Sequence, residues 1–149
     1  MSLRNLQAIG RLQPYEPDAA GIVKLLQAAR RNLADARIAE ISADNRFDAA
    51  YKCVMQCAML GLWANGYRTA TSQPGHHQTA IQSLGMTMEV SQSVIVVLDA
   101  LRRQRNLSDY EGDPISTVTL QACIDKAQGL LTHTEQWLQT HRPDLLTPP

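Results

Sequence analysis

Apolar residues recur at steps of three and four along most of the chain, the spacing of one face of an α-helix. The first stripe follows Pro17 and Asp18, a typical helix start, and predicts a helix over residues 18–41. The second stripe predicts a helix that has Asp44 as its N-cap and ends near Asn65. This second helix carries two apolar stripes, so we expect it at the centre of the fold or in a dimer interface.

Three further helices are predicted after this central one. A turn-forming stretch at residues 71–75 precedes a short helix over residues 76–84, and a longer helix follows from about Glu89 to Tyr110. The last helix has Ser116 as its N-cap and stops before Pro143. The sequence therefore predicts an all-α fold, an antiparallel up-and-down bundle of four to five helices with no convincing paired strands.

The two ends of the chain show little periodicity. Residues 1–17 are interpreted as a lead-in segment and residues 143–149 as a frayed tail, which leaves residues 18–142 as the bundle. With 149 residues, of which 44% are hydrophobic and 19% charged, the chain has the size and composition of one soluble domain.

No apolar run approaches the roughly 20 residues that a membrane-spanning helix needs. No apolar stretch of signal-peptide length follows Arg4, so we expect a cytoplasmic protein that does not enter a membrane. The formal net charge is zero, so any phosphate binding has to come from a local cluster of basic residues.

Metal and cofactor motifs are not found. Cys53, Cys57 and Cys123 form neither an even set nor a close pair of ligands in a loop, and we expect them to be buried, reduced thiols. His133 and His141 have no further ligands at suitable steps. Glycine loops that bind nucleotides are also missing, so neither a metal nor a cofactor is expected.

The best candidate for a site is the arginine-rich helix end at residues 102–110. Extending the apolar stripe of the fourth predicted helix, residues 89–110, by one turn reaches Arg102 and Arg105. The planar guanidinium of arginine suits phosphate because it can donate two parallel hydrogen bonds, and Asn106 and Tyr110 could add neutral donors. The alternative is an ordinary ion pair between Arg105 and Asp109, four residues apart, and the spacing alone favours this simpler interpretation.

His76 and His77 are the candidate general bases, because an imidazole titrates near neutral pH. Adjacent residues on a helix point about 100° apart, so at most one of the two would face a given site. Two solvated histidines in a loop are the alternative.

Several stretches together resemble the HEPN superfamily of small helical nucleotide-binding domains. Residues 47–66 resemble the central helix of that family, His76 and His77 its histidine-bearing segment, residues 105–110 its arginine motif, and residues 116–137 its closing helix. The resemblance spans residues 18–140. It implies a homodimer that binds RNA phosphate or a nucleotide, with a nucleotidyltransferase as the partner in a toxin–antitoxin pair.

In catalytic members of this family, an arginine neutralises the scissile phosphate of RNA and a histidine later in the motif transfers protons, without a metal. Tyr110 stands in this chain where that histidine would be. A tyrosine with a pKa of about 10 can donate a hydrogen bond at pH 7 but is a poor base, so binding fits better than catalysis. A histidine from the preceding turn could take the missing role.

These considerations define two sets of candidate residues. The catalytic set is Arg105, Tyr110 and His77, and the phosphate-binding set is Arg102, Arg105, Asn106, Asp109, Tyr110 and His76. The leading hypothesis is a phosphate-binding module. The alternatives are a metal-independent ribonuclease toxin and a non-catalytic interaction or scaffold bundle.

Overall fold

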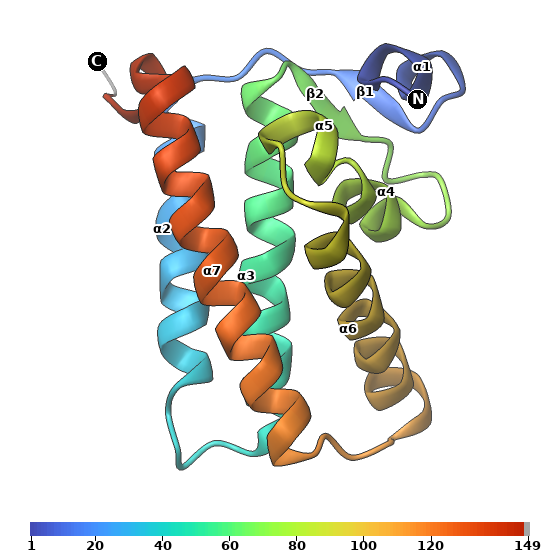
Figure 1. Cartoon of the computed structure of the whole chain (residues 1–149), viewed down its shortest axis with the longest axis vertical. Helices are drawn as coiled ribbons and strands as arrows, with labels where there is room; N and C mark the ends of the chain where they lie inside the picture. The colour runs from blue at the N-terminus through green and yellow to red at the C-terminus, as the bar shows by residue number, and fades with distance from the viewer. Residues whose placement is uncertain (148–149) are drawn as a thin grey trace.

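The computed structural model describes residues 1–147 and is mostly helical (Figure 1), which confirms the predicted all-α bundle. Four long helices alternate in direction along one axis: α2 (Ala19–Ala36), α3 (Ala43–Ala64), α6 (Gln92–Glu111) and α7 (Thr117–His141). The short helices α4 (His76–Gln82) and α5 (Leu84–Met88) lie between α3 and α6 at one end of the bundle. No helix within residues 1–147 is long and apolar enough to span a bilayer.

Helix α3 is central, as its two apolar stripes predict. It packs along α2 and α7, and on its other side it contacts α4, α5 and α6. Twelve of its 22 residues are buried. Both stripes are therefore covered within one chain, and they no longer support a dimer interface on α3.

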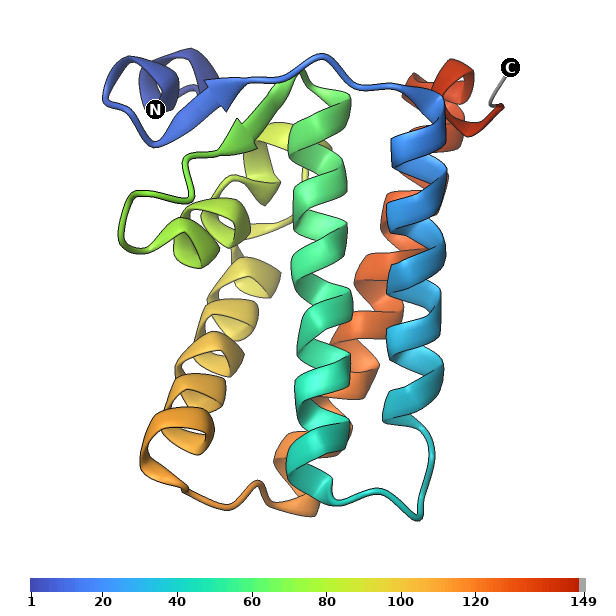
Figure 2. The ribbon, with the colours of Figure 1, turned by 180° about the vertical axis from the view of Figure 1, so that it is seen from behind.

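Helix α6 is attached less closely than the other long helices. Its buried residues are Ile95, Leu98, Asp99 and Leu101, and none of its residues after Leu101 is buried. The ribbon of α6 leans away from α3 towards its C-terminal end (Figure 2). The arginine-rich part of the sequence thus lies on the less covered half of α6.

Two predicted helix starts are confirmed and one is wrong. Asp18 caps α2 by accepting a 2.6 Å hydrogen bond from the backbone N–H of Gly21, and Ser116 caps α7. Ser42, not Asp44, caps α3. The carboxylate of Asp44 instead accepts a 2.9 Å hydrogen bond from the backbone N–H of Ile115, which joins the first turn of α3 to the α6–α7 loop.

The first predicted helix is too long at its C-terminal end. Helix α2 ends at Ala36, whereas the sequence predicted residues 18–41. The last buried residue of this stripe is Ala36, and the apolar side chains of Ile38 and Ile41 are exposed in the loop that follows.

The expectation that the chain has no paired strands is wrong. Strand β1 (Leu12–Pro14) pairs antiparallel with β2 (Tyr67–Thr69), and Leu12 is buried opposite Thr69. Helix α1 (Leu3–Ala8), capped by Ser2, precedes the sheet. The predicted lead-in segment is thus folded against the α4–α5 end of the bundle, and strands of three residues are too short to reveal themselves by alternation.

The predictions of a short helix over residues 76–84 and of a frayed tail over residues 143–149 also need correction. The short helix predicted over residues 76–84 ends at Gln82, and the hydroxyl of Ser83 donates a 2.6 Å hydrogen bond back to the carbonyl of Thr79 before α5 begins. In the predicted tail, η1 (Pro143–Leu146) is a 3₁₀-helix whose Leu145 is buried. Residues 148–149 of that tail lie outside the described residues.

Candidate functional site

Arg105 lies in a contact between α6 and α3. Its Nε is 2.9 Å from Oδ2 of Asp109, one turn later on α6, and 3.5 Å from Oδ1 of Asp48 on α3. Its guanidinium carbon sits 5.6 Å from the ring centroid of Tyr51, also on α3, within the range of a cation–π contact. The ion pair expected from the spacing of Arg105 and Asp109 is therefore present, and Asp48 adds a second carboxylate to it.

Tyr51 links this arginine to the histidine turn. The Tyr51 hydroxyl lies 3.2 Å from Nδ1 of His77 at the start of α4. Residues from three helices, α3, α4 and α6, thus meet around one buried phenol ring. The sequence left open whether a histidine lies near Arg105, and His77 does so through Tyr51.

Burial and the neighbouring charges shift the pKa values of Tyr51 and His77. Burial raises the pKa of Tyr51 to about 12, although the positive charges of Arg105 and Arg102 lower it in part. Burial also lowers the pKa of His77, and the charges of His76, Arg105 and Arg102 lower it further. At neutral pH Tyr51 is therefore a protonated phenol and His77 a neutral imidazole.

A second ion-pair cluster lies two turns earlier on α6. Asp99 is buried, and its two carboxylate oxygens contact Nε of Arg102 at 2.9 Å and Nη2 of Arg103 at 2.8 Å. The side chain of Arg102 is 16% exposed, whereas that of Arg103 is 69% exposed. Arg102 is thus held inside the structure, and Arg103 reaches towards solvent.

Not all of the predicted site residues gather around Arg105. Tyr110 is 77% exposed, and it lines a hollow of about 410 Å³ with Asn106 and Leu107, away from the contact with α3. Helix geometry explains this, because positions one and five after Arg105 turn away from the side that Asp109 shares with it. His76 packs edge-on against His77, with ring centroids 4.6 Å apart, and is not among the groups that contact Tyr51.

Three residues of this site were not among the sequence candidates: Asp48, Tyr51 and Asp99. Tyr51 lies on the apolar stripe of the second predicted helix and within residues 47–66, and neither feature predicts a role in a site. Asp99 could have been found, because a lone aspartate next to the apolar stripe, three and four residues before two arginines, has the spacing of an ion pair. Asp48 comes from a distant helix, and no spacing within the sequence relates it to Arg105.

The cysteines and tryptophans take part in the packing of the fold and not in the group around Arg105. Cys53, Cys57 and Cys123 are free and buried, as expected, and burial raises the pKa of Cys123 to about 12. Trp63 packs on Tyr15 and Trp137 on His141. Within residues 1–147, no three His, Cys, Asp or Glu side chains are grouped so that they could hold a metal ion.

Comparisons of the chain with known protein families, with curated proteins and with solved structures found no match.

Proposed function

We propose that this chain binds a phosphate group, of RNA or of a nucleotide, through Arg105. The supporting observation is which nitrogen of the Arg105 guanidinium faces the neighbouring carboxylates. The nitrogen that approaches both Asp48 and Asp109 is Nε, and among residues 1–147 no hydrogen-bond acceptor is assigned to the two terminal nitrogens. These two nitrogens form one edge of the planar group and can donate two parallel hydrogen bonds to phosphate oxygens.

The surroundings of Arg105 favour a prearranged site over a mobile surface side chain. The side chain is only 23% exposed, and it is held by two carboxylates and by the face of Tyr51. Such fixation reduces the conformational entropy that an arginine loses on binding a ligand. Tyr51 and the neutral His77 add polar groups beside it without adding a negative charge.

His77 also supports a catalytic version of the proposal, in which the chain cleaves the RNA that it binds. A neutral imidazole can accept a proton, and His77 is connected to the motif arginine through Tyr51. In a metal-independent ribonuclease, His77 would therefore take the role that Tyr110 cannot fill. The resemblance to HEPN proteins extends this version to a toxin–antitoxin pair with a nucleotidyltransferase.

The proposal includes a homodimer that forms through the outer face of α6. Leu107 is 40% exposed there, with Arg103 four residues before it and Glu111 four residues after it. If two copies of α6 cross antiparallel on a two-fold axis at Leu107, Arg103 of one copy faces Glu111 of the other. Tyr110, the one aromatic residue of α6 and 77% exposed, would be covered in the same contact.

A non-catalytic interaction bundle is the second candidate, and the balance of charges favours it. Arg102, Arg103 and Arg105 are each paired with an aspartate, and the three aspartates 48, 99 and 109 leave no local excess of positive charge. A polyanion gains less from such a neutral cluster than from an open basic patch.

Binding of a short fluorescent single-stranded RNA separates these candidates. We expect RNA binding that weakens with salt. Arg105→Gln should weaken it at least about tenfold, because the variant loses the charge and at least one of the two charge-assisted hydrogen bonds. Arg31→Gln is the matched control, because Arg31 is an exposed arginine on α2. Equal loss in both variants, or no binding by the wild type, would favour the interaction bundle, and cleavage of the RNA that disappears in His77→Gln would favour the ribonuclease.

A further inference from the structure

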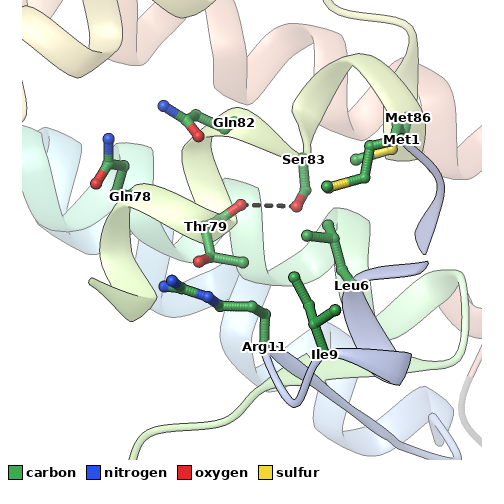
Figure 3. A pocket seen from close by; sticks show the side chains of 9 residues that line it. All are labelled: Met1, Leu6, Ile9, Arg11, Gln78, Thr79, Gln82, Ser83 and Met86. Atoms are coloured by element: carbon green, nitrogen blue, oxygen red, sulfur yellow. Dashed lines mark hydrogen bonds between the residues drawn. The ribbon is translucent and has the colours of Figure 1, made fainter. Parts of the chain in front are cut away.

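A separate cavity lies between the N-terminal residues 1–11 and the short helices α4 and α5 (Figure 3). It has a volume of about 420 Å³ and is lined by α1, by the turn before β1, and by α4 and α5. This volume falls within the roughly 300–1,000 Å³ typical of small-molecule sites. None of its lining residues belongs to the group around Arg105.

The apolar side of this cavity is formed by side chains that are poorly covered. Helix α1 has no buried residue, although Leu6 packs partly against the core. Ile9 is 61% exposed and Met1 is 82% exposed, and both line the cavity together with Leu6 and Met86. A ligand with an apolar part would remove these side chains from water, which is favourable.

The polar side of the cavity is defined by Arg11. Figure 3 shows its guanidinium beside Thr79, at a distance from Met1 and Met86. Its Nη1 donates a 3.3 Å hydrogen bond to the carbonyl of Pro74, which ties the side chain to the loop before α4. Within residues 1–147, no carboxylate forms an ion pair with Arg11, in contrast to the three arginines of α6.

The floor of the cavity offers few other hydrogen-bond donors. The hydroxyl of Thr79 donates to the carbonyl of Gly75 at 3.2 Å, and that of Ser83 donates to the carbonyl of Thr79 at 2.6 Å. Both hydroxyl hydrogens are therefore used within α4. Arg11 and the amides of Gln78 and Gln82 remain as the donors for a ligand, and Figure 3 shows Arg11 on the side of Leu6 and Ile9 and the two amides on the opposite side of Thr79.

We propose that this cavity binds an aliphatic monocarboxylate, with the carboxylate on Arg11 and the chain across Leu6, Ile9 and Met86. One cationic side chain matches a single anionic group, and the apolar side opposite matches a chain without further polar atoms. This inference does not depend on the proposed function, because Arg105 takes no part in it.

Decanoate is a suitable probe, with decanol and decylammonium as comparison ligands that have the same chain and a different head. Nuclear magnetic resonance of isotope-labelled methionine and isoleucine methyl groups reports on Met1, Met86 and Ile9 separately. We expect saturable shifts of these three methyl groups with decanoate, and at least about tenfold weaker binding of decanol and of decylammonium, because neither carries the anion that Arg11 would bind.

Substitutions of the residues that line the cavity test whether decanoate binds there. Arg11→Gln is expected to weaken decanoate binding about tenfold and to leave decanol binding unchanged, whereas Arg4→Gln, an exposed arginine on α1, should change neither. Ile9→Gln should weaken both ligands, while Ile38→Gln, at an exposed position in the α2–α3 loop, should have no effect. The absence of saturable shifts, equal affinity for decylammonium, or unchanged decanoate binding in folded Arg11→Gln would each overturn the proposal.

Discussion

Tyr51 determines the character of the candidate site at the scale of single residues. Its ring lies under the guanidinium of Arg105, and its hydroxyl contacts His77. An aromatic ring in this position gives the arginine a face to rest on and gives the histidine a polar neighbour. Arg105 and His77, which come from separate candidate groups in the sequence, are thus joined by a core residue of α3.

The lowered pKa of His77 predicts how its contribution to stability depends on pH. Burial, followed by the charges of His76, Arg105 and Arg102, lowers this pKa in the folded chain, whereas an unfolded histidine titrates at about 6.5. Below about pH 6.5 the unfolded chain therefore binds more protons at this position, and the free energy of unfolding decreases as the pH falls through that range. His77→Gln should remove this part of the decrease.

Urea unfolding of the wild type and of His77→Gln at pH 7.5 and pH 5.5 measures the effect, taking roughly these two values to bracket the histidine titration. His141→Gln serves as the control, because His141 is exposed at the end of α7. A wild-type chain that loses no more stability on acidification than His77→Gln would show that His77 is not held in its neutral form.

The site was only partly predictable, for reasons that concern individual residues. The pair of Arg105 and Asp109 follows from a spacing of four on one helix, and the structure contains it. The contribution of Asp48 depends on how α6 packs on α3, which no local pattern encodes. Tyr110 was included because of its place in a motif, but helix geometry points it away from Arg105.

At the scale of secondary-structure elements, close packing of α5 against α3 depends on Gly61. A Cβ atom at this position would lie 2.8 Å from Oγ1 of Thr87 and 3.1 Å from Cε of Met88. The approach of α5 also lets Asn65 donate hydrogen bonds to the carbonyls of both Gly61 and Thr87. The α4–α5 end, which carries His77, is thereby fixed to the central helix.

Gly61→Ala is expected to lower the free energy of unfolding by about 1–3 kcal/mol, because α5 would have to move away from α3. Gly129→Ala is the matched comparison, since nothing lies within 4 Å of a Cβ atom at this exposed position of α7. It should raise the free energy of unfolding by about 1 kcal/mol through helix propensity. Denaturation by urea measures both, and equal effects of the two substitutions would contradict this account of the α3–α5 contact.

The long helices were predictable because their apolar stripes are long, whereas the short elements were not. Each long helix has enough turns for the spacing of three and four to stand out, and capping residues such as Asp18 and Ser116 mark two of their starts. The pairing of β1 with β2 depends on residues that lie 57 positions apart, as Leu12 and Thr69 do. Such a pairing follows from the tertiary fold and leaves no periodic signal in so short a strand.

At the scale of the whole molecule, the proposed dimer makes a distinct prediction about charge. Arg103→Glu and Glu111→Arg should each weaken a dimer that is formed on a two-fold axis at Leu107, because like charges would then face each other. The double variant carrying both changes should restore the dimer, since the opposite charges face again.

Sedimentation of the wild type, the two single variants and the double variant tests this arrangement. Glu40→Arg, an exposed position between α2 and α3, controls for the change in net charge. Arg103 also contacts Asp99, so thermal unfolding of each variant confirms that the chain remains folded. A monomeric wild type, or a double variant that stays monomeric beside a dimeric wild type, would contradict the proposed interface.

The claim that Arg105 binds phosphate is tested most directly by following its own side chain. Nuclear magnetic resonance of the arginine Nε–H groups and the histidine rings, recorded while a short single-stranded RNA is added, observes Arg105 and His77 in the same experiment. We predict saturable shifts of Arg105 and His77 that diminish as salt is raised, with no change at Arg31. Unchanged resonances of Arg105, or shifts shared equally by Arg31, would contradict the claim.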